Sequence, residues 1–274
     1  MGIVKTLSEI AGEHLDAVSD AAVATFMAAI RPIYGSTEGG APDHIGTCVL
    51  IRVDGLPYLV TAAHVLDENR NTTMYLGVNG KMPVLTGTFQ ATAAPGGRRE
   101  DDHYDFGWQS MEAWDAAKYN QLPFIDAEKI TSTSAHNENH FYVALGYPNS
   151  KNKKHDLKKR KVTPVHMTYT AKAKAMPALC EKLGLSGHDH TFIPHDPKLS
   201  RNSAGQLINS LQPRGSSGGA LIDVGPISSI EAMKPGYRYE QKLAGVLIEN
   251  HKDHKVIAAV NIDVVVREIR SGAL

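Results

Sequence analysis

Short β-like runs separated by turn residues recur along most of this chain, and they limit its fold more than any other feature. The clearest pair is GTCVLIRVDGLPYLVTAAHV, residues 46–65, where two apolar runs flank Asp54-Gly55, a dipeptide typical of a two-residue hairpin. Further runs of this kind occupy residues 73–78, 84–90, 106–111, 141–146, 162–170, 190–193, 220–224, 242–248 and 255–260. Many short strands with little helix between them predict a mainly β protein, a barrel or a sandwich.

Three segments instead show helical patterns. Residues 6–30 carry apolar side chains at helical spacing and no turn signal, which predicts one or two amphipathic helices packed on the β-rich body. Residues 176–185 predict a short inserted helix, with Pro177 near its start and Gly184 or Gly187 near its end. Residues 262–271 predict a C-terminal helix that Gly272 closes.

The bulk composition excludes several classes of protein. Lys plus Arg and Asp plus Glu number 29 each, so no overall charge favours nucleic acid or a membrane surface as a partner. Two cysteines are too few for a disulfide scaffold. No apolar run approaches the length of a membrane span, and no N-terminal signal is visible. We therefore expect a soluble protein of a reducing compartment, the cytoplasm.

Three stretches carry residues that can do chemistry. His64 ends the run YLVTAAH, where a core histidine is the ordinary interpretation. Ser217 lies in PRGSSGGALID, where glycines permit a tight turn whose amide hydrogens converge on one point, although a surface loop would look similar. Asp105 in DDHYDFGW enters a strand edge, where an aspartate is unfavourable unless something binds it, and Asp102 is the rival.

Together these stretches resemble the motifs of trypsin-like serine proteases of the bacterial intracellular type. The order histidine, aspartate, serine is that of the chymotrypsin-like enzymes. TAAHV resembles their histidine motif, YDFGW their aspartate motif and GSSGGAL their nucleophile motif. ALGYP at 144–148 and the run 245–248 resemble accessory strands of the same family, so the resemblance covers about residues 40–270.

The resemblance implies a fold and a mechanism. The fold is two antiparallel six-stranded β-barrels at about 40–125 and 135–262, within a peptidase domain of residues 31–274 that comes after the helical segment 1–30. Ser217 would be the nucleophile, His64 the general base and Asp105 the residue that orients the imidazole. The amides of Gly215 and Ser217 would form the oxyanion hole. The implied activity is endopeptidase cleavage through an acyl-enzyme without metal or organic cofactor. A binding module without turnover and an esterase using the same triad are the alternatives.

Specificity and partners are expected from less specific signals. Leu211, Ile248, Glu249 and Asn250 fall where the family contacts substrate, and the absence of a carboxylate at 211 favours a small or medium apolar side chain over Lys or Arg. The run KNKKHDLKKRK at 151–161 is either a solvated loop or a docking surface for an activating protein partner. The pairs His188/His190 and His136/His140 have metal-pair spacing, but polar loops explain them as well, so we expect no metal site.

Overall fold

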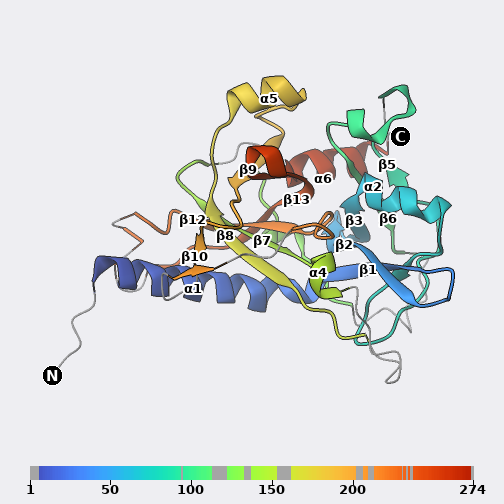
Figure 1. Ribbon diagram of the computed structural model, residues 1–274, viewed down its shortest axis with the longest axis horizontal. Coiled ribbons are helices and arrows are strands. Elements are labelled where there is room, and N and C mark those ends of the chain that lie inside the picture. The colour runs from blue at the N-terminus through green and yellow to red at the C-terminus, as the bar shows by residue number, and fades with distance from the viewer. Residues whose placement is uncertain are drawn as a thin grey trace.

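A computed structural model of the chain describes residues 6–93, 95–112, 122–132, 137–152, 162–201, 206–208, 213–229, 231–232, 234 and 237–272. The predicted architecture is confirmed: the protein is mainly β, with two six-stranded antiparallel sheets, an N-terminal helix and a C-terminal helix (Figure 1).

The first sheet has the strand order β4-β1-β2-β3-β6-β5. Its strands are β1 (Ile30–Ser36), β2 (Pro42–Val53), β3 (Leu56–Ala62), β4 (Tyr75–Leu76), β5 (Gln90–Ala91) and β6 (Phe106–Ser110). The expected hairpin joins β2 to β3: Asp54 and Gly55 have φ of 49° and 83°, as a two-residue turn between twisted strands requires. Because β1 belongs here, the first half begins at Ile30, earlier than the expected boundary near residue 40.

The second sheet has the order β8-β7-β12-β13-β14-β9, and a separate two-stranded sheet lies beside it. Its strands are β7 (Phe141–Gly146), β8 (Met167–Lys172), β9 (His190–Pro194), β12 (Ala220–Gly225), β13 (Lys242–His251) and β14 (Val256–Asn261). The small sheet pairs β10 (Ser200–Arg201) with β11 (Leu207–Ile208).

Five helices and several short 3₁₀ turns occur in the described ranges. The helices are α1 (Leu7–Phe26), α2 (Ala63–Asp67), α4 (Asn149–Asn152), α5 (Pro177–Leu183) and α6 (Ile262–Ser271). The 3₁₀ turns are Met27–Ala29, Glu68–Arg70, Pro95–Gly97, Arg99–Asp101, Ala127–Lys129 and Lys252–His254. Gly184 and Gly272 end α5 and α6 in the left-handed conformation, with φ of 67° and 60°.

The N-terminal segment forms one helix, which packs on the half of the molecule that comes later in the chain. Thr6 and Glu9 form a reciprocal capping box at its start. Phe26 is fully buried, and α1 lies against β7, β8 and β12 of the second sheet. Since β1 of the first sheet comes directly after this helical segment, the segment ties the two halves together.

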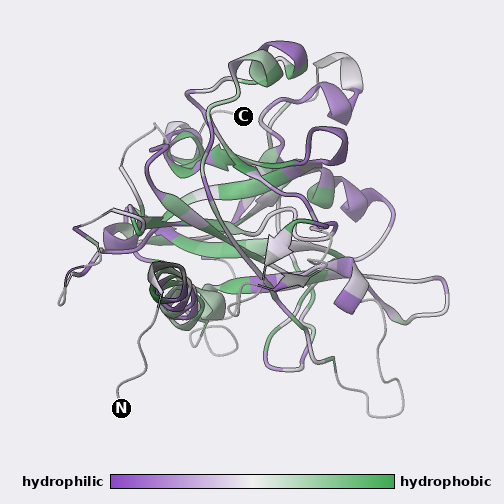
Figure 2. Ribbon diagram, turned by 60° about the vertical axis from the view of Figure 1, so that its left-hand side comes forward, coloured by the Kyte–Doolittle hydropathy of each residue, from purple (hydrophilic) through white to green (hydrophobic). Residues whose placement is uncertain are grey.

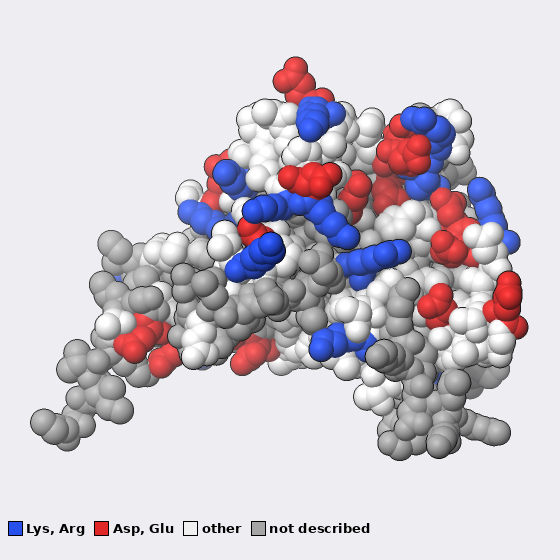
Figure 3. All heavy atoms as spheres, viewed as in Figure 1, with Lys and Arg blue, Asp and Glu red and all other residues white. Residues whose placement is uncertain are grey.

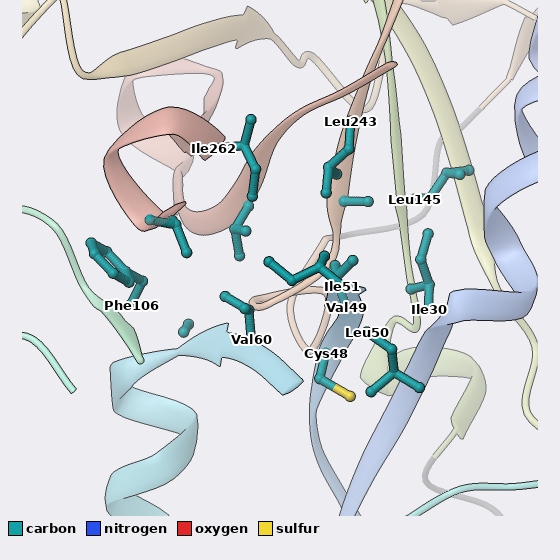
Figure 4. Close-up of a cluster of buried hydrophobic side chains, with 14 of the residues drawn as sticks. Ile30, Cys48, Val49, Leu50, Ile51, Val60, Phe106, Leu145, Leu243 and Ile262 are labelled. Atoms are coloured by element: carbon teal, nitrogen blue, oxygen red, sulfur yellow. The ribbon is translucent and has the colours of Figure 1, made fainter. Parts of the chain in front are cut away.

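Apolar side chains from both sheets and from α6 make one continuous core. Val49, Ile51 and Val60 come from the first sheet, and Leu145 and Leu243 come from the second (Figure 4). Hydrophobic residues concentrate in the central strands, and hydrophilic ones concentrate in the outer loops (Figure 2). Each such fully buried aliphatic side chain contributes about 1.5–3 kcal/mol, so the cleft between the sheets has a rigid base.

Two expected strands are wrong or displaced. Residues 84–89 form no strand but only isolated backbone contacts, because Gly87 takes a φ of 114° that breaks the extended run. The strand expected over 162–170 begins at Met167. Pro164 has no amide hydrogen to donate, and Asn152 binds both the N–H and the C=O of Val165 with its side chain.

Both cysteines, Cys48 and Cys180, are free and buried. None of the helices in the described residues combines the length and the apolar character that a membrane span requires.

Candidate active site

The turn from β3 into α2 positions His64. The strand runs buried to Ala62, and His64 is the second residue of the helix. The Ala63 N–H donates to the carbonyl oxygen of Asp105 at 2.9 Å, which fixes this corner against the loop that precedes β6. The histidine therefore stands at the end of a rigid element.

Asp105 is the aspartate that contacts His64. Its Oδ2 lies 2.6 Å from His64 Nδ1, and its Oδ1 accepts the His64 backbone N–H at 2.9 Å. Since a carboxylate accepts, Nδ1 carries the proton and Nε2 is left as the basic nitrogen. Asp105 has a φ of 43°, an uncommon conformation for a residue with a side chain, and these bonds hold it there.

Asp102, the rival aspartate, has other partners. Thr92 Oγ1 donates to its Oδ2 at 2.5 Å, and Arg99 forms an ion pair with the same oxygen. Asp102 is buried, and it anchors the loop that carries Asp105 instead of contacting His64.

Ser217 lies in a loop that both sheets hold. The Thr47 N–H of β2 donates to the Ser217 carbonyl at 2.9 Å, and the Gly218 N–H donates to the Leu247 carbonyl of β13 at 2.6 Å. Gly218 has a φ of 84°, and a Cβ there would lie 1.9 Å from the Thr47 carbonyl oxygen. Only glycine permits this close approach, which leaves the partly exposed Ser217 in the cleft.

The amides of Gly215 and Ser217 donate to no acceptor within the described part of the chain. The Arg214 carbonyl accepts the Asn149 N–H at 2.7 Å. Because a trans peptide points its N–H opposite to its C=O, the Gly215 N–H is directed away from Asn149. The Gly215 carbonyl is held in turn by Thr47 Oγ1 at 2.9 Å. The peptide groups on both sides of Gly215 are thus fixed, and the Gly215 N–H remains available as a donor.

Sequence reasoning missed the residues that hold this loop. Asn149 Oδ1 lies 2.5 Å from His44 Nδ1, and Thr47 Oγ1 accepts the Tyr147 N–H at 3.0 Å. His44 and Thr47 belong to the first sheet, whereas Tyr147 and Asn149 come after β7 of the second. No local motif marks these residues, because their roles exist only when the two sheets meet.

His64 and Ser217 line one cavity of about 430 Å³. Of the expected substrate-contacting residues, Ile248 and Glu249 line it too. The register of β13 against β14 shifts between Leu247 and Glu249, a bulge that re-aims the strand beside the cavity. Leu211 lies outside the described residues, and for Asn250 only its backbone place in β13 is described.

The charges around His64 favour its protonated form. Burial by itself would lower the pKa of His64, but the hydrogen bond and the negative charge of Asp105 outweigh it and raise the pKa above its ordinary value. The charge of Glu249 acts in the same direction. The His64 side chain is 42% exposed and that of Asp105 is 13% exposed, so the imidazole reaches the solvent while its partner does not.

The described histidines of the two candidate metal pairs, His188, His190 and His140, have structural partners. Both ring nitrogens of His190 lie near carbonyl oxygens, at 3.0 Å from Ser186 and 2.8 Å from His103, whereas His188 contacts Asp189. His140 binds Asp223. Across the described ranges, no three His, Cys, Asp or Glu residues are grouped as a metal site would need. His136 and residues 153–161 of the basic run lie outside the described residues.

Comparisons with known proteins add little to this geometry. No family model and no curated protein matches the chain. A solved structure described as "Structure of Glu endopeptidase in complex with MPD" is similar at 14% identity, with a TM-score of 0.47, over 89% of this chain and 90% of that one. A likeness at this level says nothing about catalysis, which depends on the local geometry.

Proposed function

We propose that the protein is a serine endopeptidase in which Ser217, His64 and Asp105 form the catalytic triad. The observation that carries the proposal is the 2.6 Å contact of His64 Nδ1 with Asp105, together with a shared cavity that brings the other side of the imidazole and Ser217 to the same solvent space.

The chemistry is a consequence of these positions. Ser217 Oγ attacks the scissile carbonyl carbon while His64 Nε2 takes the hydroxyl proton. The Gly215 and Ser217 amides donate to the oxyanion that forms. His64 then returns the proton to the departing amine, which leaves an ester on Ser217. A water molecule, deprotonated by His64, hydrolyses that ester and restores the serine.

The cavity supports cleavage after a small or medium apolar side chain. Its apolar lining comes from Ile45, Val65, Pro213, Leu247, Ile248 and Ile257, and the charged residues Asp43, Glu68, Arg214 and Lys252 line other parts of it. Glu249 lines it as well, with a side chain that is 61% exposed, so this charge stays in contact with water. An apolar side chain can be buried on the apolar part of this lining.

Covalent labelling tests the proposal. A fluorophosphonate is expected to modify the purified chain once, on Ser217, and peptide mapping identifies the residue. Cleavage of a peptide library with apolar residues before the scissile bond is expected to stop in the labelled protein. An adduct on another residue would refute the triad, and turnover of esters without any turnover of peptides would refute the endopeptidase assignment.

A further inference from the structure

A second cavity, of about 170 Å³, lies where β1 and the turn after β4 meet the segment that comes after β7. It shares no lining residue with the cavity of His64 and Ser217. Arg31, Lys81, Tyr34 and Tyr147 line it, and its described lining includes no aspartate or glutamate. The proposed triad makes no use of it.

Arg31 is the unusual residue of this cavity. It is half-buried in β1, whereas its neighbours Ile30 and Pro32 are buried. Its Nε is buried and has no hydrogen-bond partner among the residues that the structure describes. Within the described residues Arg31 forms no ion pair either. A buried donor on a charged group costs free energy unless something accepts from it. An anion bound beside the Arg31 guanidinium would offset that cost.

Lys81 supplies a second positive charge at the same cavity. Val78 and Lys81 exchange both backbone hydrogen bonds, at 2.9 and 2.8 Å, across Asn79 and Gly80. The φ values of those two residues, 49° and 79°, define a tight turn that fixes the position of Lys81. Lys81 is exposed, and no carboxylate of the described chain pairs with it.

The tyrosines do not neutralise this charge. Burial raises the pKa of Tyr147 to about 12, although the charge of Arg31 acts in the opposite direction. Burial also raises the pKa of Tyr34. Both hydroxyl groups therefore stay protonated at neutral pH. The lining that the structure describes thus carries two positive charges and no negative one.

We propose that this cavity binds a small dianionic oxyanion, a phosphate group either free or carried by a small phosphomonoester. The Arg31 guanidinium and the Lys81 ammonium group carry two positive charges, which match the two negative charges of a phosphate dianion. A ligand with a single carboxylate would leave one of the positive charges uncompensated. The charges that select the anion are those of the cavity itself. The chain as a whole has equal numbers of basic and acidic residues, and both signs are interspersed on the face seen in Figure 3. The proposal stands independently of the proposed protease activity.

Calorimetric titration of the full chain with inorganic phosphate, at constant ionic strength set by chloride, tests the proposal. We expect one site per chain. Arg31→Gln is expected to weaken binding at least tenfold and Lys81→Ala severalfold. Lys172→Ala, a control on β8 of the second sheet, is expected to bind as the wild type does. Unchanged affinity in both Arg31→Gln and Lys81→Ala, each checked for folding by circular dichroism, would overturn the site.

Two further arms identify the source and the chemistry of the anion. Glycerol phosphate that competes with inorganic phosphate for the site, and binds more tightly, identifies a phosphomonoester; weaker competition identifies the free ion. Acetate that binds as well as phosphate does would overturn the preference for a dianion. Because phosphate also stabilises folded proteins generally, a rise in melting temperature supports the site only where Arg31→Gln reduces it. If Arg31→Gln does not fold, the Lys81→Ala titration decides, since Lys81 is exposed.

Discussion

Two histidine–aspartate pairs join residues far apart in the chain, His64–Asp105 and His140–Asp223, and their difference shows what makes one of them a candidate catalyst. His64 Nδ1 lies 2.6 Å from Asp105, and His140 Nδ1 lies 2.9 Å from Asp223. Each aspartate is mostly buried, with side-chain exposures of 13% and 15%. By these measures the two pairs are nearly alike.

They differ on the far side of the imidazole. His140 Nε2 lies 3.1 Å from the side-chain Nδ2 of Asn137, and the Tyr239 hydroxyl group donates to Asp223 at 3.0 Å. The imidazole and the carboxylate of this pair therefore both have further partners. His64 Nε2 has no partner within the described chain, and the ring is 42% exposed beside Ser217. A histidine–aspartate contact alone therefore does not mark a catalytic site. The distinctive feature is that His64 Nε2 is left without a partner beside Ser217, the proposed nucleophile.

The largest expected effect breaks the comparison at the serine. Ser217→Ala removes the hydroxyl group that His64 Nε2 activates in the proposed triad, and we expect turnover to fall on the order of 10⁶-fold. The matched control is Ser216→Ala, which deletes a buried hydroxyl that makes no hydrogen bond within the described residues. Initial rates on one peptide measure both variants. Activity of Ser217→Ala within tenfold of the wild type would contradict the assignment.

The second prediction contrasts the two aspartates. Asp105→Asn should lower kcat about 10⁴-fold, because an amide cannot hold the imidazole in the tautomer that leaves Nε2 basic. Asp223→Asn should leave kcat/KM within about threefold but destabilise the fold by about 1–3 kcal/mol, because it disturbs a hydrogen-bonded network. Steady-state kinetics and urea unfolding of the two variants separate these effects. An equal loss of activity in both variants would contradict the prediction, because it would show that contact with His64 is not what makes Asp105 important for turnover.

The third prediction concerns pH. A general base must be neutral, and the pKa of His64 is raised, chiefly because Asp105 outweighs the effect of burial. We therefore expect kcat/KM to rise with pH through an apparent pKa above the ordinary histidine value of about 6.5 and to be lost below it. The Asp223→Asn variant should show the same midpoint. A profile that is flat from pH 5 to 9 would count against His64 as the base.

The smallest expected effect refines that profile. The negative charge of Glu249 contributes to the raised pKa of His64, so Glu249→Gln should move the midpoint of the pH profile downward. Because the Glu249 side chain is 61% exposed, salt should weaken its influence, and the difference between variant and wild type should shrink at high ionic strength. A midpoint that moves upward would show that Glu249 acts through packing instead of through its charge.

Local sequence signals predicted the elements that local physics determines. The Asp54-Gly55 hairpin and the helix closed by Gly272 were predicted because each depends on one turn or one cap. The strand expected over 84–90 failed because the φ of Gly87 depends on the surrounding packing. The sequence favoured Asp105 over Asp102 because Asp105 directly precedes the strand-like FGW, whereas the different partners of the two carboxylates are visible only in the structure. Asn149 was missed for the same reason: its contact with His44 joins residues 105 positions apart.

Thr47 joins the two halves of the proposed active site. The Thr47 N–H donates to the Ser217 carbonyl, and the Thr47 hydroxyl group donates to the Gly215 carbonyl. The Thr47 carbonyl oxygen accepts from the Thr61 hydroxyl group of β3. One residue of β2 thus contacts both the first sheet and the loop that carries Ser217. A newly synthesised chain that has folded only its first half can position His64 and Asp105 but has no nucleophile loop. Proteolytic competence would then arise only when the last strands have docked.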